Sequence, residues 1–148
     1  MVQMNRISAE KSLLIRDEYD IVSACSIGEQ IVDELGMGVR ARYQIAVIVS
    51  ELSQNMLLYA GSGVITIQRL NWNGRAGLEI MAVDSGPGIA EVETALENMD
   101  TSNDENGTGL ETIKRFADEF EIDSEAGRGT TITARKWRKQ EQKTSVIF

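Results

Sequence analysis

Two polar side chains, Glu51 and Asn55, stand four residues apart in a long segment with apolar residues at helical spacing. Side chains four apart on a helix are neighbours, so both would lie on one flank of the apolar stripe. A carboxylate can accept a proton, and an amide oxygen can bind a hard cation such as Mg²⁺. The pair would suit the rim of a cleft, although taken alone the spacing is more typical of a solvated helix flank.

A glycine-containing segment, Asp-Ser-Gly-Pro-Gly at 84–88, follows a β-like run. Gly86 and Gly88 would let the backbone approach a ligand closely, and Asp84 could accept a hydrogen bond from an amino group. The alternative is an ordinary turn, for which the same residues are well suited.

Two later segments also combine glycine with threonine. Asn-Gly-Thr-Gly-Leu at 106–110 precedes a helical pattern, where exposed N–H groups and a helix N-terminus favour anions such as phosphate. A helix cap with flexible glycines is the alternative. Gly-Arg-Gly-Thr at 127–130 enters the last strand, which hairpin geometry alone would explain. No Gly-x-x-x-x-Gly-Lys-Ser/Thr run occurs, so the sequence excludes a P-loop.

The elements that would position these residues follow from periodicity. We expect a strand over 12–19, a helix from an N-cap at Asp20 to Leu35, and a second helix over 39–60. Strands over 64–72 and 77–84 flank Asn73-Gly74, a strong hairpin signal. A short helix over 90–99, a helix from 107–109 onward, and a hairpin of strands 121–125 and 129–137 complete the chain.

This order predicts an α/β two-layer sandwich, in which a mixed or antiparallel sheet is covered on one face by helices. The length of 148 residues suits a single domain spanning 1–148, with a core over about 12–137. We expect residues 1–11 to be loose and residues 100–106 to be exposed.

Composition excludes several classes of function. The net charge of −8 argues against a nucleic-acid or anionic-membrane binder. The absence of histidine excludes Ser-His-Asp chemistry and His-ligated metals, and the one cysteine, Cys25, reads as a buried apolar residue of a cytoplasmic protein. The basic run 135–139 is expected to be a solvated strand end, with a docking patch for an acidic partner as the alternative.

Taken in order, the four polar segments resemble those of the Bergerat-fold (GHKL) ATPases, and the resemblance spans about residues 12–137. Within that superfamily the chain is most similar to the anti-sigma-factor serine/threonine kinases, especially the stressosome switch kinases. The segments that carry this similarity are Ser-Glu-Leu-Ser-Gln-Asn at 50–55, Leu-Tyr-Ala-Gly at 58–61, Gly-Pro-Gly-Ile at 86–89, Gly-Thr-Thr-Ile at 129–132 and Lys-Trp at 136–137.

The resemblance implies an ATP-dependent protein kinase. Glu51 would be the general base on the attacking hydroxyl, and Asn55 would hold Mg²⁺ against the ATP phosphates. Asp84 would bind the adenine amino group in a pocket shaped by Gly86 and Gly88.

The remaining site residues follow from the same resemblance. Gly107, Thr108 and Gly109 would close over the phosphates, and Thr130 would support the adenine end. Residues 101–106 depart from the family's glycine-rich lid, because they hold two acidic residues and no glycine. Negative charge beside a triphosphate is unfavourable, so this departure puts catalysis in question.

By the same resemblance, the partner would be a STAS-domain antagonist or scaffold protein, and a phosphatase, a cyclase or a sigma factor would act downstream. One alternative is an anti-sigma factor that sequesters a sigma factor, with ATP choosing the partner. Another is a nucleotide sensor without transfer activity. No nucleic-acid or membrane partner is expected.

Overall fold

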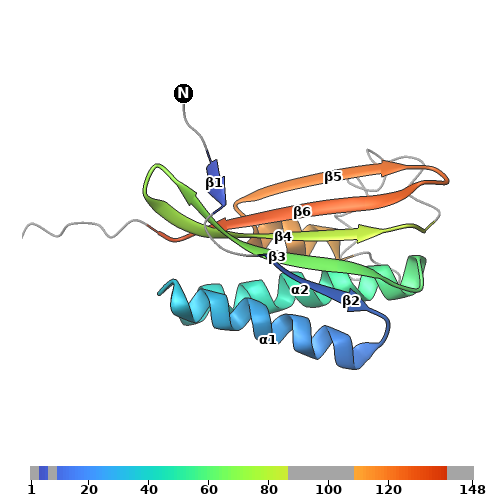
Figure 1. Cartoon of the computed structure of the whole chain (residues 1–148), viewed down its shortest axis with the longest axis horizontal. Coiled ribbons are helices and arrows are strands. Elements are labelled where there is room, and N and C mark those ends of the chain that lie inside the picture. Colours follow the sequence, from blue (N-terminus) through green and yellow to red (C-terminus); the bar gives the residue numbers. More distant parts are fainter. Residues whose placement is uncertain (1–3, 7–9, 87–108, 140–148) are drawn as a thin grey trace, which may run out of the picture.

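The computed structural model describes residues 4–6, 10–86 and 109–139. It shows a six-stranded sheet with two long helices packed along one side, which confirms the predicted two-layer α/β sandwich (Figure 1). The strands are β1 Met4–Arg6, β2 Lys11–Ile15, β3 Gly63–Trp72, β4 Arg75–Asp84, β5 Glu119–Glu125 and β6 Gly129–Trp137. The helices of the described residues are α1 Glu18–Glu34, α2 Val39–Tyr59 and α4 Leu110–Phe116.

All strand pairs in the sheet are antiparallel. The order is β1-β3-β4-β6-β5, and β2 also pairs with β3. Strands β1 and β2 therefore share one edge of β3, with β1 opposite residues 70–72 and β2 opposite residues 63–67. The tight turn between β3 and β4 has both Asn73 and Gly74 at positive φ, as the Asn-Gly signal predicted.

The core lies between the sheet and the helices. Strand side chains alternate in direction, so every second residue of β3 and β4 points toward the helices. The fully buried residues of this layer are Ile65, Ile67, Leu78 and Ile80 from the strands and Ile45, Ile48, Leu52 and Met56 from α2. Each such side chain contributes about 1.5–3 kcal/mol when fully removed from water.

The first helix begins earlier than its sequence signals indicated. Asp17, in extended conformation, is the N-cap of α1, and its carboxylate accepts a hydrogen bond from the Asp20 N–H at 3.0 Å. Asp20 lies inside the first turn and accepts from the Arg16 N–H at 2.9 Å. The expected strand over 12–19 therefore ends at Ile15. The Asp17 carboxylate satisfies a free N–H of the first helical turn, and the Asp20 carboxylate binds the N–H of Arg16, which precedes the N-cap.

Other boundaries also differ from expectation, among them the start of β4 at Arg75 rather than at residue 77. Residues 4–6, expected to be loose, form β1 against β3. Helix α4 ends at Phe116, since Ala117 is extended, and β5 then begins at Glu119 rather than at residue 121. The expected helix over 90–99 and the segment 100–106 lie outside the described residues.

Among the helices that the structure describes, none is both long enough and apolar enough to cross a membrane. Cys25 is partly buried and packs against the core, and burial raises the pKa of its thiol, with Glu29 adding to the shift. Its interpretation as a small apolar residue is therefore supported.

Candidate nucleotide-binding site

Glu51 and Asn55 lie one turn apart on α2, and both are half-buried. Their neighbours Leu52 and Met56 are buried in the core, whereas Gln54 is exposed. The two polar side chains therefore stand at the boundary between core and solvent, as the helical spacing predicted. At this boundary a polar side chain can face an open site while water has limited access to it.

The Glu51 side chain packs directly against Gly109, the residue that caps α4. A β carbon added at Gly109 would lie 2.8 Å from the Glu51 Cδ and closer still to its Oε2. Gly109 also has φ +72°, in the left-handed region that glycine adopts without steric cost. Two independent constraints, the backbone angle and the nearby carboxylate, thus require glycine at this position.

Burial raises the pKa of the Glu51 carboxyl above its ordinary value of 4.5. The cause is desolvation, because removing a carboxylate from water disfavours its charged form. A raised pKa makes the carboxylate a stronger base than a solvated glutamate. The position and the proton affinity of Glu51 therefore suit an acceptor of protons.

A second group of predicted residues meets at the end of the sheet. Asp84 closes β4 and is the direct cross-strand partner of Thr130, the second residue of β6. Both follow the alternation of the helix-facing positions, since Ala82 pairs with Ile132 two residues away. Asp84 is half-buried and Thr130 is buried, so the end of the sheet presents two polar groups toward the helix layer.

The loop after β4 is held close to the C-terminal end of α2. The Gly86 N–H donates to Asp84 Oδ1 at 3.0 Å, which folds the chain back over the aspartate. A β carbon at Gly86 would lie 2.6 Å from the Ala60 Cβ, so glycine permits this approach. The contact joins the Asp84 end of the sheet to the helix that carries Glu51 and Asn55.

Two residues of this region were missed in the sequence analysis. Ser124 Oγ lies 2.8 Å from Thr130 Oγ1 and also donates to the Gly129 carbonyl at 3.2 Å. Gly129, at φ +106°, packs against the backbone of Asp84 and Ser85 so closely that no β carbon would fit. The cross-strand pairing of β5 with β6 creates this cluster, and only the pair Gly127 and Gly129 around the turn gave any signal of it.

Of the nine predicted site residues, the structure describes six, which fall into the two adjoining groups above: Glu51, Asn55 and Gly109, then Asp84, Gly86 and Thr130. Gly88, Gly107, Thr108 and the acidic segment 101–106 lie outside the described residues. Helix α2 connects the groups, with Glu51 against Gly109 at one point and Ala60 against Gly86 at another.

The donor set fits a nucleotide held with a metal ion. Within the described part of the chain, no three His, Cys, Asp or Glu side chains gather to hold a metal by themselves. Mg²⁺ commonly keeps few protein ligands and is completed by substrate phosphates, a role for which the Asn55 amide oxygen is suited. Glycine at 86, 109 and 129 keeps the surrounding backbone free of β carbons.

Comparison with known proteins gives similar chains among kinases and anti-sigma factors. Over 123 residues the chain is 42% identical to the serine/threonine-protein kinase RsbT of Bacillus subtilis (strain 168), covering 83% of this chain and 92% of that protein. It is 31% identical over 99 residues to an anti-sigma F factor of Caldanaerobacter subterraneus subsp. tengcongensis, covering 63% and 68%. An anti-sigma F factor of Clostridium acetobutylicum is 31% identical over 98 residues, covering 62% and 67%.

A family match covers most of the chain. Residues 16–136 match the family described as histidine kinase-like ATPase domain. This range of the chain contains the elements of both groups of site residues. The match confirms the resemblance that the four polar segments indicated. This protein is therefore a member of the histidine kinase-like ATPase domain family.

Proposed function

We propose that this protein is a serine/threonine-protein kinase, which transfers the γ-phosphoryl group of ATP to a hydroxyl on a STAS-domain partner. The observation that carries the proposal is the position of Glu51, half-buried on α2 and in contact with Gly109. Phosphoryl transfer needs positioning and charge neutralisation more than covalent chemistry, and this contact supplies a positioned base. The name of the Bacillus subtilis relative, a serine/threonine-protein kinase, supports the same assignment.

In this proposal Glu51 accepts the proton of the partner's serine or threonine hydroxyl as the hydroxyl oxygen attacks the γ-phosphorus, and the bond from the γ-phosphorus to ADP breaks so that ADP leaves. Desolvation, which raises the pKa of Glu51, also limits competing water around the carboxylate. Gly109 holds the start of α4 against Glu51, so the first turn of α4 and the base are positioned together. Gly107 and Thr108 would complete the cover over the phosphates.

Asn55 is assigned to Mg²⁺, which would neutralise charge on the phosphates during transfer. One helical turn separates Asn55 from Glu51, so the metal and the base would face the same phosphoryl group. Asp84 is assigned to the adenine amino group, with Gly86 and Gly88 shaping the pocket. Thr130, tied to Ser124 at 2.8 Å, supports that end.

The partner assignment extends the proposal. A STAS-domain antagonist or scaffold protein would receive the phosphoryl group, and its release would free the kinase to engage a phosphatase, a cyclase or a sigma factor in the cytoplasm. A second candidate function is a sequestering protein with little transfer activity. The names of the two anti-sigma F factors favour it, since each matches this chain over more than 60% of its length.

The test is a transfer assay with the purified full chain. Labelled ATP, Mg²⁺ and a STAS-domain protein from the same organism are incubated with wild type, Glu51→Gln and Asn55→Ala. We expect label on the partner with wild type only. Glu121→Gln, an exposed carboxylate on β5, and Gln54→Ala, an exposed amide beside Asn55, are matched controls that should retain transfer.

Nucleotide binding by calorimetry distinguishes the outcomes. If the kinase binds ATP but the partner stays unlabelled, the kinase function is rejected and the sequestering function is favoured. Co-purification of this protein with a sigma factor then tests the sequestering function. Absence of ATP binding would reject both functions. Equal transfer by Glu51→Gln and wild type would show that Glu51 is not the general base.

A further inference from the structure

A cluster of basic side chains lines a cavity at the end of the sheet opposite to Asp84 and Thr130. The cavity measures about 340 Å³, a size typical of sites that hold a ligand or a partner's side chains. Its cations are Arg40, Arg75, Arg115, Lys136 and Lys139. They are five of the fifteen Lys and Arg residues of a chain whose net charge is −8.

The cations come from four elements that the fold brings together. Arg40 lies in the first turn of α2, Arg75 opens β4, and Arg115 is in the last turn of α4. Lys136 is opposite Leu78 in the register of β6 and β4, so it faces the helix layer. Lys139 follows the end of β6.

Among the described residues, one acidic side chain lines the cavity, and it already has a protein partner. Asp118 Oδ2 accepts a hydrogen bond from the Trp137 N–H at 2.8 Å. Lys136 is held in place through a 2.8 Å hydrogen bond to the Phe116 carbonyl, which ends α4. That contact satisfies one donor of Lys136 without cancelling its charge. Arg115 is paired with Glu111 on α4 at 3.1 Å, so the excess of positive charge in the cavity comes from Arg40, Arg75, Lys136 and Lys139.

The local electrostatics are unfavourable without an anion. Burial lowers the pKa of Lys136; Asp118 opposes the shift, while the charges of Lys139 and Arg40 add to it. The first turn of α2 has no acidic residue and no side-chain cap at Gly38, and it places Arg40 at the positive end of the helix dipole. An anion bound here would relieve both the mutual repulsion and the clash with the helix dipole.

The walls between the cations are apolar. Met37, Ala41, Phe116 and Trp137 contribute to the lining. A small inorganic anion would use the cations alone, whereas a peptide with acidic and apolar side chains would use both kinds of surface. Arginine forks bind carboxylates in a bidentate manner, which suits Asp and Glu side chains.

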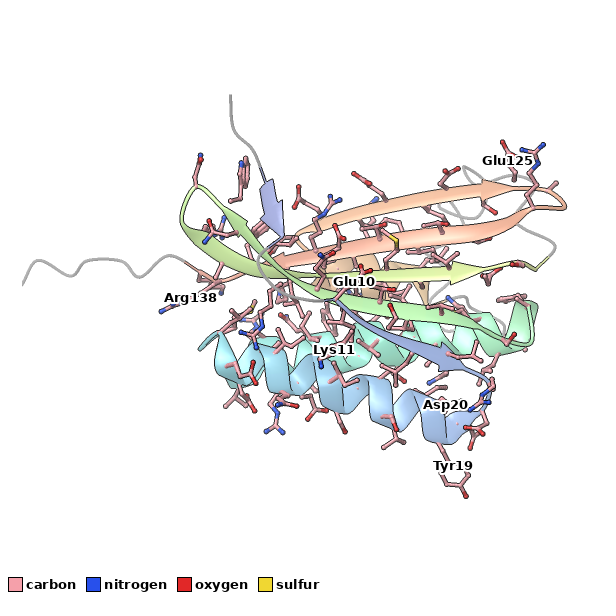
Figure 2. All side chains as sticks on the ribbon, viewed as in Figure 1. Glu10, Lys11, Tyr19, Asp20, Glu125 and Arg138 are labelled. Atoms are coloured by element: carbon pink, nitrogen blue, oxygen red, sulfur yellow. The ribbon has the colours of Figure 1, made fainter. Side chains whose placement is uncertain are left out.

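The cavity and the residues assigned to the adenine end lie at opposite ends of the sheet. Thr130 and Trp137 are separated along β6 by about 24 Å, and Arg40 and Asn55 along α2 by about 22 Å. Figure 2 shows Arg138, which adjoins Lys139, and Glu125, which pairs with Gly129, at opposite ends of the sheet. An occupant of the cavity therefore would not overlap the adenine end. The lining comes nearer to the phosphate end, since Gln44 precedes Glu51 by about 10 Å along α2.

We propose that this basic cavity is a docking site for an acidic segment of a protein partner. The sequence analysis kept a docking patch for an acidic partner near residues 135–139 as an alternative, and this proposal extends it. Lys136 and Lys139 line the cavity, whereas Arg135 pairs with Glu79 at 2.8 Å on the other face of the sheet. This inference rests on the proposed function, because that function requires a protein partner. Partner docking at this end of the sheet would leave the end with Asp84 and Thr130 free for the nucleotide.

The test measures peptide binding to the full chain without nucleotide, so it does not depend on kinase activity. The probe is a fluorescein-labelled peptide that alternates Glu with Leu, and the matched peptide alternates Gln with Leu. We expect the Glu peptide to bind and the Gln peptide not to bind. Added salt should weaken binding, because the Debye length falls to about 8 Å at physiological ionic strength.

Charge reversal locates the site. Arg40→Glu and Lys139→Glu should each weaken binding about tenfold, equivalent to about 1.4 kcal/mol. Lys11→Glu, the same change at an exposed position on β2 outside the cavity, should leave affinity unchanged. Arg40→Glu also places an acid at the start of α2, so its thermal unfolding midpoint should not fall.

Several results would overturn the proposal. Absence of Glu-peptide binding, or equal losses with Lys11→Glu and Arg40→Glu, would reject the cavity as a peptide site. Binding of inorganic pyrophosphate that Arg40→Glu abolishes, without peptide binding, would make it a small-anion site instead. ATP binding measured on the same samples separates this failure from failure of the proposed function.

Discussion

The carboxylate of Glu51 lies against the α carbon of Gly109, so the residue assigned as the base is in contact with the cap of α4. The side chains of the two elements meet where α2 is half-buried and α4 begins. Glycine at 109 allows α4 to start beside the carboxylate without displacing it. The geometry of the base therefore depends on a residue that has no side chain.

Gly109→Ala should disturb this contact more than backbone strain alone explains. A non-glycine residue in the left-handed region costs about 1–2 kcal/mol, and here the new methyl group would also displace the Glu51 carboxylate. We expect the rate of phosphoryl transfer to fall at least about tenfold, through a shift of about 1.4 kcal/mol in the activation barrier. Transfer and thermal unfolding are measured together.

Gly127→Ala is the matched control for that change. Gly127 has φ +82°, yet an added β carbon would meet no atom within 4 Å. This variant should show the loss in stability without the loss in transfer. If the two variants lost transfer equally, contact with Glu51 would not be the cause.

Glu51→Gln should stabilise the fold at neutral pH. Because burial raises the pKa of Glu51, folding favours the protonated carboxyl over the carboxylate. The stability that this preference contributes is fully present below the ordinary pKa of 4.5 and is lost as the pH rises through the folded-state pKa. The variant should therefore unfold at a higher temperature than wild type at neutral pH, with a gap that narrows as the pH falls toward 4.5.

The comparison uses thermal unfolding across a series of buffers. Glu121→Gln, whose side chain is 69% exposed, should follow wild type throughout. A Glu51→Gln variant that is less stable than wild type at neutral pH would contradict the desolvation argument. It would indicate instead that the ionised carboxylate stabilises the fold.

Much of this site follows from local sequence patterns. The helical spacing of apolar residues placed Glu51 and Asn55 on one flank of α2, and Asn73-Gly74 marked the β3–β4 hairpin. Both signals act over a few residues, so they can be recognised in the sequence without knowledge of the tertiary fold. The pairing of Asp84 with Thr130 is different, because it depends on β6 joining β4 across an interval of the chain.

What was missed has two causes, a local ambiguity between neighbouring residues and a contact between distant segments. Asp20 was expected to be the N-cap of α1, yet Asp17 takes that position while Asp20 binds the Arg16 N–H. Two carboxylates so close in sequence give the same capping signal. Residues 4–6 gave no strand signal because β1 is stabilised by the edge of β3, far along the chain.

Asp84→Asn should weaken ATP binding while leaving the fold intact. The asparagine carbonyl can still accept the Gly86 N–H, which now donates to Asp84 Oδ1 at 3.0 Å. The variant loses the charged acceptor assigned to the adenine amino group, a loss of about 1.5–3 kcal/mol in binding free energy. Calorimetry with ATP measures the loss, and Asp123→Asn, exposed on β5, is the matched control. Unchanged affinity would remove Asp84 from the adenine end.

The ion pair of Glu79 and Arg135 gives a prediction on stability alone. Glu79 Oε2 accepts from Arg135 Nε at 2.8 Å, with side chains only 3% and 14% exposed. Glu79→Gln would leave the arginine charge poorly compensated and should lower the free energy of unfolding by about 2–4 kcal/mol. Glu121 also approaches Arg135, at 3.6 Å, but its side chain is 69% exposed.

Chemical denaturation of four variants tests this prediction. Glu121→Gln should change the free energy of unfolding by less than about 0.5 kcal/mol, because exposed pairs are screened by water. The double change Glu79→Gln with Arg135→Gln should recover part of the loss seen with Glu79→Gln, since it removes the uncompensated charge. Equal effects of the two glutamate variants would show that burial does not set the strength of this pair. A double variant less stable than the sum of both single changes would reject charge imbalance as the source of the loss.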